Sequence, residues 1–172
     1  MHAKPSSKRG PRLLGIAIGV GLAAVALAAW RVPGGERTLG ADVRFEGLSS
    51  GAVGTQPAHA FISAPSLLPG SSSSGKLRVR NQTGVPLAVR LYALPSSRDL
   101  DALLQVRLAA GARAIYEGAL GRLRAAGTRP LRLTPGESRR LQVRAALPAG
   151  LRSGFQARIV DVTLRIDARR TR

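Results

Sequence analysis

Residues 133–144, with the sequence LTPGESRRLQVR, contain a turn followed by a strand, and residues 68–81, LPGSSSSGKLRVRN, repeat this arrangement. In each, proline fixes φ near the value that a turn needs and glycine accepts a positive φ, so the chain reverses before the strand. Leucine or valine then alternates with polar, mostly basic side chains in residues 76–81 and 140–144, which places the apolar ones on one face. This pattern is typical of a β-sandwich and does not indicate an enzyme.

Turn residues between apolar segments predict two hairpins. A turn at residues 83–84 separates the strand at 76–81 from a second alternating segment at 86–94, so we expect these two to pair. Residues 105–109 and 114–116 are predicted to pair in the same way.

The remaining segments predict short helical turns and two long strands. Residues 96–99 resemble a capping box before the helical spacing of leucines at 100–104, and a second helical turn is expected within residues 117–126. Strands are predicted at 139–145 and 156–167. Seven or eight strands in all predict an all-β protein, a single jelly-roll or immunoglobulin-like antiparallel sandwich with one or two short helical turns.

The N-terminus has the pattern of a signal peptide or membrane anchor. Four basic residues precede eighteen residues without a charge, 13–30. We expect residues 1–29 to be a signal peptide, cleaved after Ala28 or Ala29, because glycine and alanine make the segment only mildly apolar. The alternative is an uncleaved transmembrane helix formed by residues 13–30. Either reading directs the protein out of the cytoplasm, to the cell surface or the extracellular space.

The rest of the chain divides into three parts. Residues 30–57 are rich in glycine, serine and small side chains and predict a flexible leader with one short strand. Residues 58–168 predict the sandwich domain, and residues 169–172 a basic tail.

The short strand in the leader, residues 41–46, is a candidate for self-assembly. Its apolar face carries Val43 and Phe45. A connector separates it from the predicted sandwich, so it is expected to pair either with its own sheet or with the open edge of a neighbouring subunit. Donation to a neighbour would build a fibre.

Composition limits the classes of partner. The chain has no cysteine, which excludes disulfides and cysteine chemistry. Its formal charge is +18, and arginine supplies 24 of its 27 basic residues. This charge favours anionic cell-wall polymers or lipid head groups. We disfavour nucleic acid, because one Trp, two Tyr and three Phe offer little for base stacking.

Two arginine-bearing strands supply a candidate binding surface. Arg78 and Arg80 alternate with apolar residues on one strand, as Arg140 and Arg144 do on another. Together they predict a polyanion-binding face; the alternative is an ordinary solvated outer face of a sheet.

The order of these motifs resembles the TasA/camelysin-like exported proteins over residues 58–168. The motifs that carry the resemblance are Leu68-Pro69-Gly70, the strand 77–81, Asp99-Leu100, the segment 115–120, the segment 133–138 and the strand 160–167. The resemblance implies a jelly-roll or Ig-like sandwich in a cell-surface or biofilm-matrix fibre subunit. It also brings a metalloendopeptidase label that some relatives carry.

Zinc chemistry finds little support in the residues. His59 is the one histidine after the signal segment, and no His-Glu-x-x-His motif is present. We therefore predict no metal site, no cofactor and no catalytic residue. The predicted function is a non-enzymatic structural subunit that associates with itself or with other surface proteins. The alternative is a membrane-anchored accessory domain that binds anionic envelope polymers, and a zinc peptidase ranks last.

Overall fold

A computed structural model describes residues 40–171 and shows a mostly-β protein with two five-stranded sheets and one helix, α1 (Leu120–Ala126). Sheet A contains, in order, β3 (Ile62–Leu67), β1 (Ala41–Leu48), β10 (Ile159–Arg170), β5 (Leu87–Pro95) and β8 (Leu131–Leu133). Sheet B contains β2 (Val53–Gln56), β4 (Ser72–Asn81), β9 (Ser138–Ala146), β6 (Gln105–Ala110) and β7 (Arg113–Ala119). The prediction of a β-rich, two-sheet fold is confirmed.

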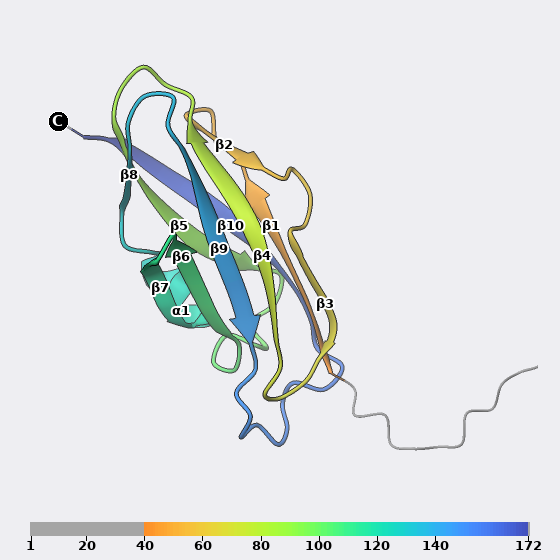
Figure 1. Cartoon of the computed structure of the whole chain (residues 1–172). Helices are drawn as coiled ribbons and strands as arrows, with labels where there is room; N and C mark the ends of the chain where they lie inside the picture. Colours follow the sequence, from red (N-terminus) through yellow and green to blue (C-terminus); the bar gives the residue numbers. More distant parts are fainter. Residues whose placement is uncertain (1–39, 172) are drawn as a thin grey trace, which may run out of the picture. The chain divides into compact units, whose positions relative to one another are not determined.

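The two sheets form layers that enclose one apolar core (Figure 1). Each long strand contributes every second side chain to it, because successive side chains of a strand point to opposite faces. In β10, Val160, Val162, Leu164 and Ile166 are buried, as their alternation predicted. The pairing of β1 with β10 is parallel, which departs from the fully antiparallel arrangement expected.

Both Pro-Gly turns are present. Gly70 and Gly136 have φ angles of 79° and 72°, a conformation that glycine adopts without the steric penalty of a side chain. In each turn the amide after the glycine donates to the carbonyl before the proline, at 3.0 and 3.1 Å. The first turn is shorter than predicted, because residues 72–75 pair with β9 and extend β4. Gly75 permits this, since a Cβ there would lie 2.0 Å from the Phe61 carbonyl oxygen.

One of the two predicted hairpins is wrong. β6 and β7 pair as expected, but β4 and β5 belong to different sheets. The turn at residues 83–84 therefore carries the chain from sheet B to sheet A. The connection from β5 to β6 also changes sheet, and it contains the helical turn predicted at residues 100–104, in which the Leu104 amide donates to the Leu100 carbonyl.

Asn81 holds together two of the connections that pass between the sheets. Its fully buried side-chain amide donates to the carbonyls of Val85, Leu133 and Thr134, and its carbonyl oxygen accepts from Thr83. These bonds join the β4–β5 connection to the β8–β9 connection, which also passes between the sheets. The bonds to Thr83 and Val85 are local to the turn, whereas those to Leu133 and Thr134 hold the end of β4 against the β8–β9 connection.

Asn81→Asp should destabilise the protein by at least about 2 kcal/mol, because it removes the amide donors to three carbonyls and buries a carboxylate. Equilibrium denaturation by urea is the measurement. Gln142→Ala, on the exposed face of β9, is the control and should change stability by about 0.5 kcal/mol or less. Equal effects of the two substitutions would contradict the role of Asn81.

The flexible leader predicted for residues 30–57 needs a correction in its C-terminal part. β1 lies inside sheet A between β3 and β10, and β2 pairs with β4 in sheet B. Val43 and Phe45 are 2% and 0% exposed and belong to the core. The structure therefore shows β1 as an interior strand of its own domain, which is the first of the two pairings expected for Val43 and Phe45. Donation of this strand to a neighbouring subunit stays a prediction.

Val43→Asp combined with Phe45→Asp should unfold the domain, since both carboxylates would be buried among core side chains. Phe45→Ala alone should cost about 3–5 kcal/mol. Arg44 stands between these two positions and points to the exposed face, so Arg44→Ala is the matched control and should leave the domain folded. Circular dichroism with thermal unfolding measures the effect, and a double variant that stays folded would show that β1 is dispensable.

Two smaller predictions also change. β10 continues through Arg170, where it pairs with Leu87, so residues 169–170 belong to a strand rather than to a basic tail. The helical turn expected within residues 117–126 is α1, preceded by a β7 that runs to Ala119.

The signal peptide or anchor predicted within residues 1–30 lies outside the described residues. Residues 40–171 contain no helix with the length and hydropathy that crossing a membrane requires.

Candidate anion-binding face

The four arginines predicted to bind polyanions all lie on the outer face of sheet B. Arg78 and Arg80 on β4 alternate with buried Leu77 and Val79, and the same alternation on β9 exposes Arg140 and Arg144. β4 and β9 are adjacent and antiparallel, so the four side chains share one surface.

Strand register adds two basic residues that the sequence argument did not include. Lys76 lies on the same face of β4, and Arg107 lies on β6, which pairs with the other side of β9. Lys76 was available from the alternation of β4 alone. Arg107 joins the face only because β6 pairs with β9, which no local pattern in the sequence specifies. We call the six residues the basic face: Lys76, Arg78, Arg80, Arg107, Arg140 and Arg144.

The basic face contains two pairs of directly opposed arginines. Arg78 is opposite Arg140, and Arg107 is opposite Arg144. Directly opposed side chains on adjacent antiparallel strands have Cβ atoms about 4.5–5.5 Å apart, and like charges at such positions destabilise a sheet. Repulsion within these two arginine pairs therefore lowers the stability of the folded sheet.

Few carboxylates offset this charge. Glu117 on β7 is the one acidic residue on the outer face of sheet B, and it pairs with Arg107 at 3.6 Å. Within residues 40–171, the other five members of the basic face form no ion pair.

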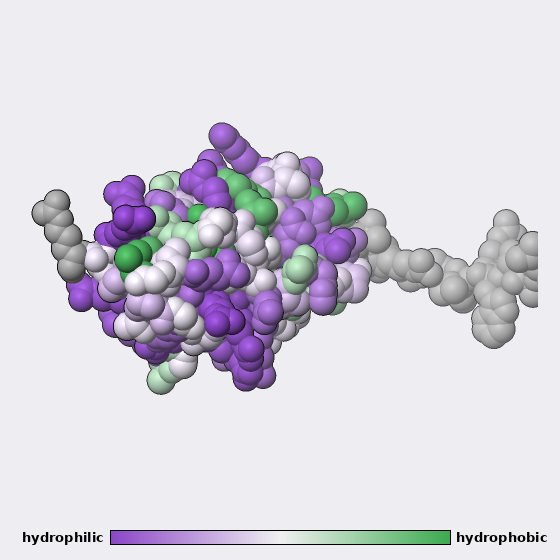
Figure 2. All heavy atoms as spheres, turned by 90° about the horizontal axis from the view of Figure 1, so that it is seen from above, coloured by the Kyte–Doolittle hydropathy of each residue, from purple (hydrophilic) through white to green (hydrophobic). Residues whose placement is uncertain are grey.

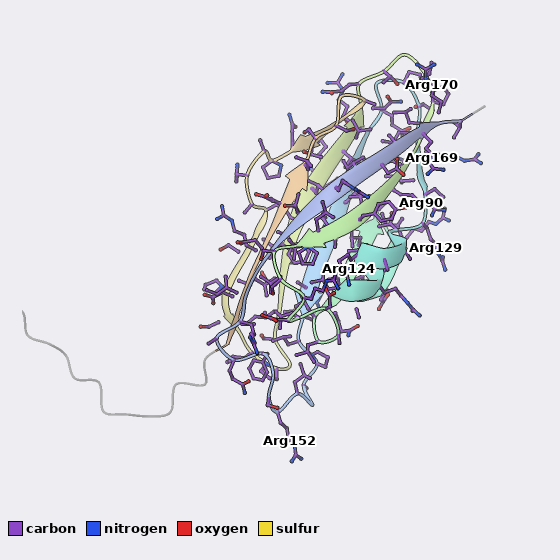
Figure 3. The ribbon with its side chains drawn as sticks, turned by 180° about the vertical axis from the view of Figure 1, so that it is seen from behind. Arg90, Arg124, Arg129, Arg152, Arg169 and Arg170 are labelled. Carbon is purple, nitrogen blue, oxygen red and sulfur yellow. The ribbon has the colours of Figure 1, made fainter. Side chains whose placement is uncertain are left out.

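The outer face of sheet A is different, because its charges are mixed. Its exposed side includes five arginines and four carboxylates. The arginines are Arg44, Arg90, Arg132, Arg165 and Arg169, and the carboxylates are Asp42, Glu46, Asp161 and Asp167. Figure 3 shows Arg90 and Arg169 on this side of the molecule, with Arg152 at its far end. Net positive charge thus concentrates on sheet B.

A hollow of about 360 Å³ lies at the β2 end of the basic face. Its lining combines two guanidinium groups with hydroxyl and amide side chains and contains no carboxylate: Ser49, Gly54, Thr55, Gln56, Arg78, Arg80, Gln82 and Ser138. Several hydrogen-bond donors around a small concave space suit one compact anionic group, such as a phosphate or a sulfate.

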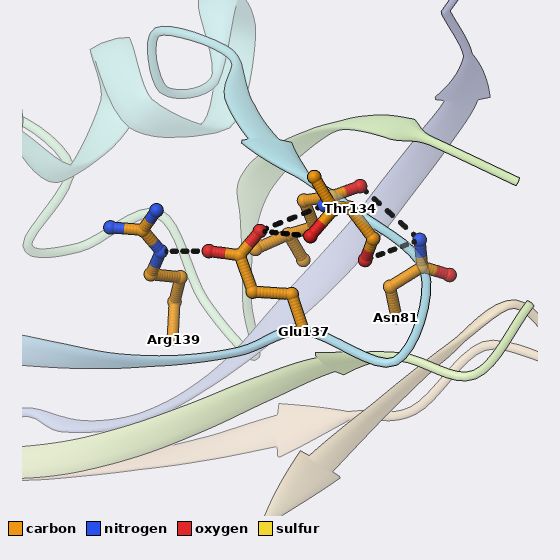
Figure 4. A network of polar contacts seen from close by, with 5 residues as sticks. Asn81, Thr134, Glu137 and Arg139 are labelled. Atoms are coloured by element: carbon orange, nitrogen blue, oxygen red, sulfur yellow. Dashed lines mark hydrogen bonds and ion pairs between the residues drawn. The ribbon is translucent and has the colours of Figure 1, made fainter.

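Glu137 lies in the turn that leads into β9, close to the basic face but not part of it. Its carboxylate accepts from the Thr134 amide at 2.8 Å, from the Thr134 hydroxyl at 2.9 Å and from Arg139 (Figure 4). The bond from the Thr134 amide, followed by the bond from Arg139, lowers the pKa of Glu137 below its ordinary value. This network fixes the start of β9.

Glu137→Gln should lower stability near pH 7, and the difference from the unchanged protein should shrink as the pH falls through about 4.5 and below. The sign follows from the lowered pKa: the folded state favours the carboxylate, so its contribution is present at higher pH and lost on protonation. Urea denaturation at pH 7 and pH 3.5 measures it. Glu117→Gln, on the exposed face of β7, is the control, and a pH-independent effect of Glu137→Gln would contradict the network.

The histidine and the carboxylates outside the basic face lie apart. His59 is exposed in the loop before β3. Asp101 accepts from Arg124 of α1 at 2.7 Å, and Asp99 pairs with Arg158 at 3.3 Å. Across residues 40–171 no three His, Asp or Glu side chains come together as metal ligands would.

Comparisons with known proteins add little. No protein family and no curated protein matches the sequence. Among solved structures, the chain is similar to AvmM, which catalyzes macrocyclization in alchivemycin A biosynthesis, with 14% sequence identity and a TM-score of 0.37. That match covers 70% of this chain and 89% of the other chain. We derive no activity from a similarity at this level.

Proposed function

We propose that this domain is a non-enzymatic accessory module that binds an anionic envelope polymer through the basic face of sheet B. The observation that carries the proposal is the pair of opposed arginines repeated across three adjacent strands, Arg78 with Arg140 and Arg107 with Arg144. A polymer with anionic groups at regular intervals would lie between these side chains and remove their repulsion.

The hollow beside Arg78 and Arg80 gives this binding a starting point. One anionic group of the polymer occupies the hollow, where guanidinium, hydroxyl and amide donors surround it. Neighbouring groups of the polymer then reach the arginines of β9 and β6. This arrangement favours phosphate or sulfate groups, which accept several hydrogen bonds at once.

The proposal includes the location and the finer fold. We propose that residues 1–30 export the protein and that it acts at the cell surface, either free or anchored by residues 13–30. We also propose that the two sheets form a jelly-roll or Ig-like sandwich, since eight of the nine connections between consecutive strands pass from one sheet to the other and only β6–β7 stays within a sheet. The alternative, a fibre subunit of the TasA/camelysin kind, stays a prediction, and the interior position of β1 gives it no support.

Replacing Arg78, Arg80, Arg140 and Arg144 by Gln should weaken binding of long-chain polyphosphate by about tenfold or more. It should also flatten the dependence of log K on log salt concentration, because fewer counterions are exchanged. Isothermal titration at several salt concentrations measures both quantities. The matched control replaces Arg44, Arg90, Arg152 and Arg169, which removes the same charge from elsewhere on the surface.

Stability provides a second readout on the same face. Arg140→Gln should leave the free protein as stable or raise its stability by a few tenths of a kcal/mol at low salt, because it relieves the repulsion with Arg78.

Two outcomes of the binding experiment would contradict the proposal. If the quadruple control variant lost as much polyphosphate binding as the basic-face variant, the attraction would be non-specific. If neither quadruple variant lost binding, the proposed face would be refuted.

A further inference from the structure

A second cavity, of about 510 Å³, lies on the side of the molecule where the edge strands of the two sheets meet. Its apolar lining comes from Ala110 and Ile115 in sheet B and from Pro130 and Leu131 at β8 in sheet A. Three arginines complete it: Arg113, Arg132 and Arg139. We call these seven residues the β7–β8 groove.

A β-bulge shapes the groove. Ala109 pairs with Ala114 and Leu108 pairs with Tyr116, so Ile115 is an extra residue in β7. As a result, Ile115 and Tyr116 both point inward and are 3% and 8% exposed. The Ile115 carbonyl accepts from the Arg129 amide at 2.9 Å, which ties β7 to the segment leading into β8. Figure 3 shows Arg129 beside α1, at this side of the sheets.

The groove has an apolar floor that the surrounding surface lacks. Ala110 and Leu131 are partly buried and pack against the core, so the floor is continuous with it. In the view of Figure 2, hydrophobic side chains reach the surface only in small separate groups among hydrophilic ones. The large hydrophobic residues that are exposed, Leu48, Leu68, Leu94 and Ile159, all lie outside the groove, so the groove is not part of a wide apolar patch.

The arginines of the groove are available to a ligand. The Nε atom of Arg139 donates to Glu137, which holds the arginine side chain in place. The two terminal nitrogens of Arg139 make no contact among the residues drawn in Figure 4. Within residues 40–171, neither Arg113 nor Arg132 pairs with a carboxylate. Three guanidinium groups against one carboxylate leave a net positive charge beside an apolar surface.

We propose that the β7–β8 groove binds an anionic amphiphile. Its carboxylate or phosphate head group lies among Arg113, Arg132 and Arg139, and its apolar chain covers the accessible apolar lining, Ala110, Pro130 and Leu131. A hydrophilic polymer would leave this floor without an apolar partner, whereas an acyl chain removes it from water. The volume of the cavity lies within the range of small-ligand pockets, about 300–1,000 Å³. This site is separate from the basic face, which carries no member of the groove.

The absence of cysteine allows a local test in the full-length chain. Ala110→Cys introduces a single thiol in the groove. As the control, Ala109→Cys places the thiol one residue earlier in β6, on the opposite side of sheet B. The alkylation rate of each thiol is measured with dodecanoate or dodecyl phosphate below its micelle-forming concentration. Acetate, inorganic phosphate and dodecanol are the comparison probes.

We expect either amphiphile to slow alkylation at position 110 saturably and to leave position 109 unchanged. Adding Arg113→Gln and Arg132→Gln to the Ala110→Cys variant should raise the amphiphile concentration that gives half-maximal protection by about tenfold or more. Adding Arg78→Gln and Arg80→Gln removes the same charge from the basic face and should have no effect at position 110. A response to one head group alone identifies its class and also supports the proposal.

Three results would overturn the proposal. Equal protection by dodecanol would show that the arginines play no part, and protection by acetate or inorganic phosphate alone would show that the apolar floor plays none. No protection by either amphiphile would exclude the site altogether.

Discussion

The buried side chain of Asn81 is the constraint on which the arrangement of the two sheets depends. One amide group bonds to two separate connections, β4–β5 and β8–β9, and both pass from one sheet to the other. Because the side chain is fully buried, its donors and acceptor must be satisfied by protein groups, and they are satisfied by Thr83 and Val85 in the first connection and by Leu133 and Thr134 at the second. β5 and β8 thereby become partners in sheet A while β4 and β9 become partners in sheet B.

The surface charge follows from this arrangement. Since β4 and β9 are neighbours, the outward arginines of the two strands, Arg78 and Arg80 on β4 and Arg140 and Arg144 on β9, lie on one surface. Pairing with β6 adds Arg107 opposite Arg144 and produces the second repulsive pair. Sheet A has arginines of similar number but also four carboxylates, so the same composition gives a mixed surface there. Location in the fold, and not the total charge of +18, distinguishes one face from the other.

The two candidate sites differ in the physical character of what they offer. The basic face is broad and has a polar hollow at one end, which suits a chain of small anionic groups. The β7–β8 groove is narrower in extent and joins arginines to the edge of the apolar core, which suits a molecule with a polar and an apolar end. Both would place an envelope component against the domain, one through charge alone and one through charge together with burial of apolar surface.

The sequence by itself determined the local features: the Pro-Gly turns with positive φ at Gly70 and Gly136, the alternation of β4, β9 and β10, and thus which arginines point outward. These depend only on backbone sterics and on the period of a strand. The tertiary structure alone decided which strands pair, because alternation fixes the face of a side chain but not the neighbour of its strand. Buried contacts and hydrogen bonds between distant residues separated β4 from β5, placed β1 in the core and brought Arg107 to Arg144.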